Sequence, residues 1–277
     1  MKDTILFGDC VDTRKQFDEK ARCCVTSPPY YGLRDYGGES NQIGLEQSPE
    51  EYIQEMVNVF RLVRDNLTDD GTLWLNIGDS YYNYRPGKGG LPQQSVSNTK
   101  QDLPDQCNRR ANKLEGLKEK DLIGIPWMLA FALRADGWYL RQDIIWSKGN
   151  PMPESVRDRC TKSHEYIFLL SKSQNYYFDV DTIKEQSRRQ RSVWNVNVKP
   201  NKQAHFATYP PELITPCILA GSEENDIVLD PFMGSGTTAM VARALGRYYI
   251  GCELHEEYNN LIQERVPINI LSTISPT

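Results

Sequence analysis

The stretch that decides the fold is Asp226–Leu254, DIVLDPFMGSGTTAMVARALGRYYIGCEL. It begins with the apolar run Ile227–Leu229, which is typical of a buried strand, and then enters the glycine turn Gly234-Ser235-Gly236. We expect a helix from Thr237, followed by a second apolar strand that ends at Glu253. A strand, a glycine turn, a helix and a further strand form half of a dinucleotide-type unit, in which glycines let a ligand approach bare backbone.

Two acidic residues, Asp230 and Glu253, stand where the two strands of this unit are expected to end. Open α/β sheets bind ligands at the carboxyl ends of their strands, and an acid about 20 residues beyond the glycines is where ribose hydroxyls are held. No Lys follows the glycines, so the pattern that cradles a polyphosphate is absent. A nucleoside without a polyphosphate therefore fits better than ATP, and S-adenosylmethionine is the first candidate. The plainer alternative is an ordinary turn from strand to helix.

The composition is that of a globular protein with a sizeable core. The chain has 277 residues, of which 39% are hydrophobic, and no apolar run approaches the roughly 18 residues that a membrane span needs. We expect one large α/β domain with insertions and no contact with a membrane. Because the N-terminus lacks a signal-peptide pattern, we expect a cytoplasmic protein.

Seven cysteines and three histidines give no sign of a metal site. No Cys-x-x-Cys pair occurs, and the histidines are too scattered for a zinc site, so we expect reduced, mostly buried thiols and no bound metal. The net charge of −5 gives no global sign of a nucleic-acid partner. Local charge is distributed differently, as described below.

The N-terminal part contains two more strands that end on polar residues. A short strand is predicted over Thr4–Phe7, followed by Gly8-Asp9, and a second over Ala21–Thr26. Because the two lie so close in sequence, we expect parallel members of one sheet with their ends on the ligand face.

The second of these strands runs into Ser27-Pro28-Pro29-Tyr30. The double proline removes two backbone donors and stiffens the turn. An amino-bearing base could donate hydrogen bonds to the Ser27 hydroxyl and the Pro28 carbonyl while its face stacks on Tyr30. A stiff loop after a strand would explain the two prolines equally well.

These motifs together resemble those of the DNA amino-methyltransferases, which methylate the exocyclic nitrogen of cytosine or adenine. Thr26-Ser27-Pro28-Pro29-Tyr30 is similar to their catalytic motif, Ser/Asn/Asp-Pro-Pro-aromatic, and Asp230–Thr238 is similar to their cofactor motif. The catalytic motif comes first, which looks like the circularly permuted beta class. The similarity continues through Ile144–Ser155 and His205–Pro210 and so spans most of the chain.

The resemblance implies a Rossmann-like, doubly wound and mostly parallel sheet in a circularly permuted methyltransferase fold, with residues 1–277 as a single catalytic domain. It implies S-adenosylmethionine as cofactor and direct methyl transfer to the amino group of a flipped base. The catalytic residues would be Ser27, Pro28, Pro29 and Tyr30. The cofactor-binding residues would be Asp9, Thr26, His205, Phe206, Thr208, Asp230, Pro231, Phe232, Gly234, Ser235, Gly236, Thr237 and Glu253.

Three acids receive separate roles from the resemblance. Asp9 would accept from the adenine amino group of the cofactor, Glu253 from its ribose, and Asp230 would lie beside its methionine part. Each acid has the alternative of an ordinary helix N-cap.

The middle of the chain carries further elements. A helix is predicted from the N-cap Ser48, a strand over Thr72–Ile77 after the turn Asp69-Asp70-Gly71, and an apolar helix over Leu122–Ala135. The strands Trp138–Trp146 and Glu165–Leu170 are joined by a loop, which indicates an antiparallel pair at one edge of the sheet. A last helix is predicted over Tyr209–Gly221, with a boundary or kink at Pro216.

Two segments are rich in basic residues and are candidates for binding double-stranded DNA. Residues 80–120 read as a flexible insertion, and residues 150–204, approximately, as a DNA-recognition segment. A solvated surface is the alternative for both. The candidate DNA contacts are Arg109, Arg110, Arg157, Arg159, Arg188, Arg189, Arg191, Trp194 and Lys199.

The target base is left open by the sequence. Ser at the position of Ser27 is, in the family, more usual for cytosine N4 enzymes and Asp for adenine N6 enzymes, so cytosine is favoured and adenine is the alternative. No cysteine nucleophile is expected, because the Pro-Cys needed for attack at a ring carbon is missing. More distant alternatives are a methyltransferase of RNA or protein amides, and a DNA-binding regulator without activity. A restriction endonuclease encoded elsewhere is a candidate partner.

Overall fold

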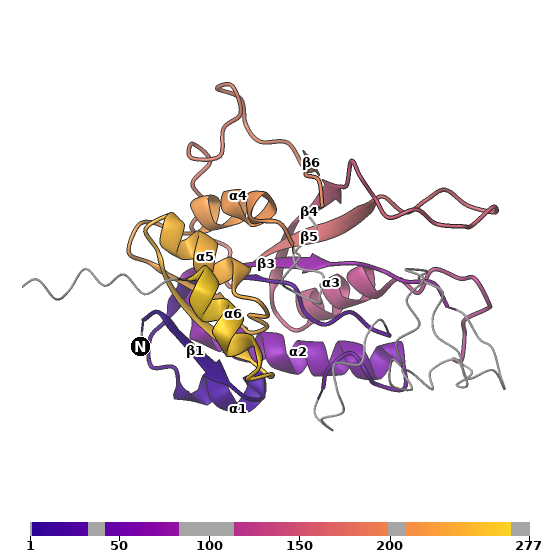
Figure 1. Ribbon diagram of the computed structural model, residues 1–277, viewed down its shortest axis with the longest axis horizontal. Helices are drawn as coiled ribbons and strands as arrows, with labels where there is room; N and C mark the ends of the chain where they lie inside the picture. Colours follow the sequence, from indigo (N-terminus) through magenta and orange to yellow (C-terminus); the bar gives the residue numbers. More distant parts are fainter. Residues whose placement is uncertain (1, 33–41, 83–113, 199–208, 267–277) are drawn as a thin grey trace, which may run out of the picture.

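The computed structural model describes residues 2–32, 42–82, 114–198 and 209–266. Its centre is one eight-stranded sheet in the order β1-β8-β7-β2-β3-β5-β4-β6. The strands are β1 (Thr4–Phe7), β2 (Ala21–Thr26), β3 (Leu67–Ile77), β4 (Tyr139–Ser147), β5 (His164–Ser171), β6 (Val193–Asn195), β7 (Ile227–Asp230) and β8 (Tyr248–Glu253). Strands from both ends of the sequence therefore lie side by side (Figure 1).

The sheet is parallel except at β5, which runs antiparallel to both of its neighbours, β3 and β4. The mostly parallel α/β architecture predicted from the sequence is confirmed. The antiparallel pairing of β4 with β5 is also as predicted, but its position at the edge is wrong. The short strand β6, which the sequence reasoning missed, pairs with β4 and forms the edge instead.

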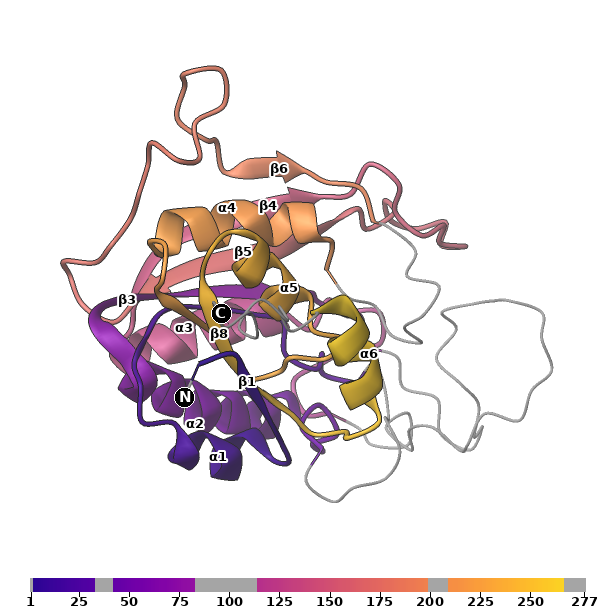
Figure 2. The same ribbon diagram turned by 60° about the vertical axis from the view of Figure 1, so that its left-hand side comes forward.

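Helices cover both faces of the sheet (Figure 2). They are α1 (Cys10–Thr13), α2 (Pro49–Asn66), α3 (Ile125–Ala135), α4 (Pro211–Gly221), α5 (Thr237–Ala244) and α6 (Tyr258–Arg265), with a 3₁₀ turn, η1, at Arg14–Gln16. The longest, α2, begins as predicted, because the Ser48 hydroxyl accepts a hydrogen bond from the Glu51 amide. None of the helices in the described ranges combines the length and apolarity needed to cross a membrane.

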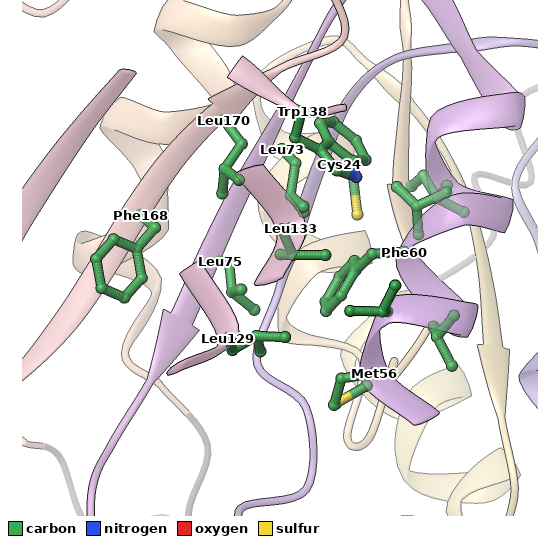
Figure 3. Close-up of a cluster of buried hydrophobic side chains, with 14 of the residues drawn as sticks. Cys24, Met56, Phe60, Leu73, Leu75, Leu129, Leu133, Trp138, Phe168 and Leu170 are labelled. Carbon is green, nitrogen blue, oxygen red and sulfur yellow. The ribbon is translucent and has the colours of Figure 1, made fainter. Parts of the chain in front are cut away.

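One face of the sheet packs against α2 and α3. Alternate residues of β3, Leu73 and Leu75, point into this layer and meet Phe60 of α2 and Leu129 of α3 (Figure 3). All four are fully buried. This burial explains the near-helical apolar spacing that predicts α2 from the sequence.

The opposite face packs against α4, α5 and α6. Trp74, the β3 residue between the two leucines, points to this side together with Ile218 of α4, Ala242 of α5 and Ile262 of α6. A parallel sheet buried on both faces needs apolar residues on both sides of each strand, which accounts for the continuous apolar runs of β2, β7 and β8.

Several boundaries differ from those predicted. The turn expected at residues 69–71 is part of β3, whose pairing with β2 jumps from Ala21↔Leu67 to Cys23↔Thr72. The extra residues bulge out of the ladder, so the strand continues through them. The third helix begins three residues later than predicted, because Gly124 has a left-handed backbone (φ 90°). Helices α1 and α6 were not predicted.

Candidate active site

The two sequence motifs meet at the carboxyl ends of adjacent strands. Thr26 ends β2, Asp230 ends β7, and the Thr26 hydroxyl donates to Asp230 Oδ1 at 2.6 Å, although 204 residues separate them. The pairing of β2 with β7 brings these ends together. The glycine turn and the Ser-Pro-Pro-Tyr corner therefore belong to one site, as the sequence analysis requires.

Asp230 is the buried centre of this junction. Its Oδ1 also accepts from the Phe232 amide at 3.0 Å, and its Oδ2 accepts from the hydroxyls of Tyr209, at 3.2 Å, and Thr238. Burial raises the pKa of Asp230 to about 6, because desolvation outweighs the hydrogen bonds that favour the carboxylate. Both oxygens are used within the protein, so Asp230 joins β2, the glycine turn and α5.

The glycine turn requires its glycines. Gly234 and Gly236 have φ values of 54° and 79°, a region that other residues rarely adopt. A Cβ at Gly234 would meet nothing closer than the Phe232 carbonyl oxygen, at 3.9 Å, so a ligand can approach the bare backbone there. The other side of the turn is held by Arg265 of α6, which donates to the Ser235 carbonyl at 2.9 Å.

Two further acids lie at the ends of β8 and β1, beside the glycine turn. Phe7 pairs with Glu253 in the ladder, so Asp9 follows directly beyond the same edge. Glu253 accepts from the Gly234 amide at 2.7 Å and the His255 amide at 3.0 Å, and burial raises its pKa. Asp9 accepts from the Val11 amide at 2.7 Å, so it caps α1, the alternative role considered for it.

These groups fit an adenosyl ligand. Carboxylates at adjacent strand ends can accept from ribose hydroxyls and from an adenine amino group, and the open side of Gly234 allows close approach. The residues that the resemblance assigns to the cofactor and that the structure describes therefore gather at one edge of the sheet. His205, Phe206 and Thr208 lie outside the described residues.

The Ser-Pro-Pro-Tyr corner, residues 27–30, is held by a polar network; we call it the catalytic corner after the motif that it resembles. The Tyr30 hydroxyl donates to Glu165 Oε2 at 2.7 Å, and Ser27 donates to the same hydroxyl at 3.4 Å. Lys148 forms an ion pair with the other carboxylate oxygen of Glu165, and Asn76 donates to Oε2 at 3.3 Å. Burial and the Glu165 charge raise the pKa of Tyr30 well above its ordinary value, so its hydroxyl stays protonated.

Backbone contacts fix the same corner. The buried Tyr52 of α2 donates to the Pro29 carbonyl at 2.9 Å. Gly78, just after β3, lies against the Tyr30 ring, because a Cβ there would come within 2.7 Å of Tyr30 Cε2. The ring of Tyr30 is thus held at its hydroxyl and along one edge.

Comparison with known proteins identifies the family. The family model N6_N4_Mtase, described as DNA methylase, matches residues 21–264. The chain belongs to the DNA methylase family. S-adenosylmethionine-dependent methylation of a DNA amino group is the activity that this membership and the joined motifs support.

Close relatives of this DNA methylase are type II methyltransferases. The chain is 50% identical over 275 residues to type II methyltransferase M.SmaI of Serratia marcescens, covering 95% of this chain and 90% of the relative. It is 48% identical over 269 residues to M.Cfr9I of Citrobacter freundii, covering 95% and 87%. Among solved structures, PvuII DNA methyltransferase (cytosine-N4-specific) shares the fold, with a TM-score of 0.71 at 19% identity, over 98% of this chain and 89% of that one.

The DNA methylase exposes most of its described candidate DNA contacts. Arg157, Arg188, Arg189 and Arg191 are all solvent-exposed, in the segments that flank β5 and β6. Arg159 is instead paired with Glu154 at 2.6 Å. Arg109, Arg110 and Lys199 lie outside the described residues.

Trp194 is a correction. Its ring is 5% exposed and packs in the core, and its indole nitrogen donates to the Arg191 carbonyl at 2.7 Å. The ring therefore cannot stack on a base. Its position in the three-residue strand β6, where it alternates with exposed neighbours, is the physical reason.

The sequence reasoning missed the residues that support Tyr30. Glu165 and Asn76 received no role, and Lys148 was quoted only as part of a similar segment. One signal was available for Glu165, because a charged residue at the start of an otherwise apolar strand needs a partner when it is partly buried. Arg265, which holds the glycine turn from α6, gave no such signal.

The described cysteines are mostly buried, as expected: Cys10, Cys23, Cys24, Cys217 and Cys252 are buried and Cys160 is exposed. Burial raises the pKa of Cys23, within β2, to about 12, which keeps this thiol protonated. Among the residues that the structure describes, no three His, Cys, Asp or Glu side chains are grouped to hold a metal ion.

Proposed function

We propose that the protein methylates the N4 amino group of cytosine at a specific site in double-stranded DNA, using S-adenosylmethionine. The observation that carries the proposal is the hydrogen bond from Thr26 to Asp230, which joins the Ser-Pro-Pro-Tyr corner to the glycine turn. Ser27 supports cytosine, because a serine at this position resembles the cytosine N4 enzymes. Adenine N6 is the second candidate.

The cofactor would lie across the strand ends already described. We assign its ribose to Glu253, its adenine amino group to Asp9 and its methionine part to the glycine turn next to Asp230. When bound, it supplies a methyl group on a sulfonium sulfur, and the neutral thioether formed on transfer is a good leaving group. Because the sulfonium is itself the electrophile, the transfer needs no metal ion.

The residues of the catalytic corner would prepare the base. An exocyclic amine is a poor nucleophile, because its lone pair is delocalised into the ring. The Ser27 hydroxyl and the Pro28 carbonyl would accept hydrogen bonds from its N–H groups, direct the lone pair towards the methyl group and stabilise the positive charge that develops on nitrogen. The methylated nitrogen would then lose one proton to solvent. Tyr30, neutral and fixed by Glu165, would present its ring for stacking on the flipped base.

The wider context is proposed from the relatives. We assign residues 1–277 to a single catalytic domain, with the exposed arginines of the recognition segment on DNA phosphates and base edges. The names of the type II relatives suggest a restriction endonuclease as counterpart. Because the substrate is DNA, we place the protein in the cytoplasm.

The test is mass spectrometry of nucleosides from the DNA of cells that express the chain, followed by long-read mapping of the modified site. N4-methylcytosine is expected, and N6-methyladenine would select the alternative base. Purified protein incubated with labelled S-adenosylmethionine and DNA, RNA or protein extract provides the second arm. Label that enters only RNA or protein would refute the proposal, and Ser27→Ala with unchanged turnover would refute the role of that residue.

A further inference from the structure

The loop between β4 and β5, residues 148–163, leaves the sheet at the carboxyl end of β4, on the same side as the catalytic corner. Ser147 pairs with His164, and Tyr166 pairs with Ile77 at the end of β3, so the root of the loop lies beside the strand end that precedes Gly78. The root also touches the catalytic corner through Lys148 and Glu165. We call residues 148–163 the projecting loop, because it extends beyond the body of the protein in both views (Figures 1 and 2).

The projecting loop is braced on one side against the residues that follow β6. Asn150 donates to the Val198 carbonyl at 2.9 Å and accepts from the Val198 amide at 2.8 Å. A Cβ at Gly149 would come within 2.5 Å of Asn197 Oδ1, so the Asn197 side chain lies close against the backbone of Gly149. The start of the loop is therefore fixed at Asn150, two residues before Met152.

The returning half of the loop is braced on the other side. Glu154 pairs with Arg159 and accepts from the Lys162 amide at 3.2 Å, which closes the loop on itself. Lys162 donates to the Asp79 carbonyl at 2.8 Å, and the Arg159 guanidinium lies 3.8 Å from the centre of the Tyr81 ring. These contacts tie the loop to the segment that follows β3.

The outgoing half of the loop carries an exposed apolar side chain. Met152 is 73% exposed, the highest value among the large hydrophobic residues of the described ranges. It lies between Pro151 and Pro153, whose rings fix their φ angles and limit the backbone freedom of this stretch. A single exposed methionine is ordinary by itself, but this one lies on a braced loop that begins beside the catalytic corner.

We propose that Met152 is a wedge that enters the DNA base stack beside the flipped target base. This inference rests on the proposed function, because it requires a base to leave the duplex. Apolar side chains such as Met and Leu are suited to insertion between base steps, which they partly unstack. Met152 follows Lys148 by four positions, so its Cα lies at most ~14 Å from that of Lys148, at ~3.5 Å per residue.

The charge of the projecting loop fits a nucleic-acid partner. The loop contains four basic residues and two acids, but Lys148 is paired with Glu165, Arg159 with Glu154, and Lys162 donates to the Asp79 carbonyl. Arg157 is exposed, so it can bind a phosphate near the inserted Met152. A protein partner for the exposed methionine would not require the loop to begin at the catalytic corner.

The test compares Met152→Ala with the matched control Tyr139→Ala. Tyr139 is 45% exposed and starts β4, so it lies at the opposite end of the strand that feeds the loop. Methylation is measured on two duplexes that contain the mapped site, one fully paired and one with an abasic position opposite the target base, which lowers the cost of flipping. Thermal unfolding and S-adenosylmethionine binding check that each variant is folded.

We expect Met152→Ala to lower kcat/KM at least about tenfold on the paired duplex, as the loss of a buried methionine predicts, and to fall within about twofold of wild type on the abasic duplex. Tyr139→Ala should match the wild-type kcat/KM on both duplexes. Met152→Leu should keep the activity that Met152→Ala loses. Unchanged activity of Met152→Ala on the paired duplex, or equal loss on both duplexes, refutes the wedge alone. If the wild-type protein methylates neither duplex, the proposed function fails together with it.

Discussion

Replacing Gly78 by alanine tests how closely the Tyr30 ring must be held. The added Cβ would lie 2.7 Å from Tyr30 Cε2 and 3.3 Å from Glu165 Cδ. Carbon atoms in ordinary contact are ~3.5 Å apart, so the ring must move by about 0.8 Å. The ring cannot move freely, because its hydroxyl is bonded to Glu165 and that carboxylate is paired with Lys148.

A displacement of this size has two measurable consequences. Misplacing a substrate-positioning group by ~1 Å can lower a rate by about 10²-fold, so we expect Gly78→Ala to reduce kcat on DNA by about 10- to 100-fold. Overpacking of this kind costs about 1–3 kcal/mol of unfolding free energy, which lowers Tm by a few degrees. The acids assigned to the cofactor lie at the ends of β7, β8 and β1, on the other side of β2 from Gly78, so the Kd for S-adenosylmethionine should stay within about twofold of wild type.

The matched control is Gly221→Ala at the end of α4. Its Cβ would lie 2.8 Å from Trp74 Nε1 and 3.0 Å from Cys23 Cβ, a similar overlap near the starts of the strands, away from the site. Both variants should lose comparable stability, measured by thermal unfolding. Only Gly78→Ala should lose turnover per folded molecule, measured with labelled S-adenosylmethionine at saturating DNA.

Wild-type turnover in a folded Gly78→Ala protein would refute the reasoning, since Tyr30 would then act without a fixed ring position. Equal loss of turnover in both glycine variants would also refute it. That result would mean that any overpacking of this sheet disturbs catalysis, wherever it occurs.

Three further predictions concern the acids and a helix cap. Asp230 has a raised folded pKa of about 6, so the stability it contributes is fully present below about pH 4 and is lost as pH rises through about 6. In urea unfolding, the unfolding free energy of the wild type should therefore fall by about 3 kcal/mol between pH 4 and pH 7, relative to that of Asp230→Asn. Ser48→Ala removes the cap on the Glu51 amide and should cost about 1 kcal/mol in the same assay without changing methylation. Glu253→Gln should raise the Kd for S-adenosylmethionine about tenfold by calorimetry, because a carboxylate is the stronger acceptor for ribose hydroxyls; an unchanged Kd would remove that assignment.

Much of the fold was predictable because its signals are local. The core spacing of α2 and its Ser48 cap, the apolar runs of the buried strands and the turn at Gly236 each lie within a few residues. The elements that were missed, α1, α6 and β6, are short and carry weak periodicity. Such elements form because the neighbouring structure covers them, and no pattern of their own predicts them.

The sequence by itself determined the nucleotide-type unit at Asp226–Leu254 and the stiff corner at residues 27–30. Glycine permits tight turns that other residues avoid, and proline fixes its own backbone, wherever they occur. Only the tertiary structure decided which side chains meet there. The strand order places Thr26 against Asp230 and Glu165 beneath Tyr30, and it buries Trp194, which its sequence neighbours place among DNA contacts. The contacts of Thr26 and Tyr30 join residues more than 100 positions apart. They depend on which strands pair, and the pairing is determined by the burial of both faces of the whole sheet.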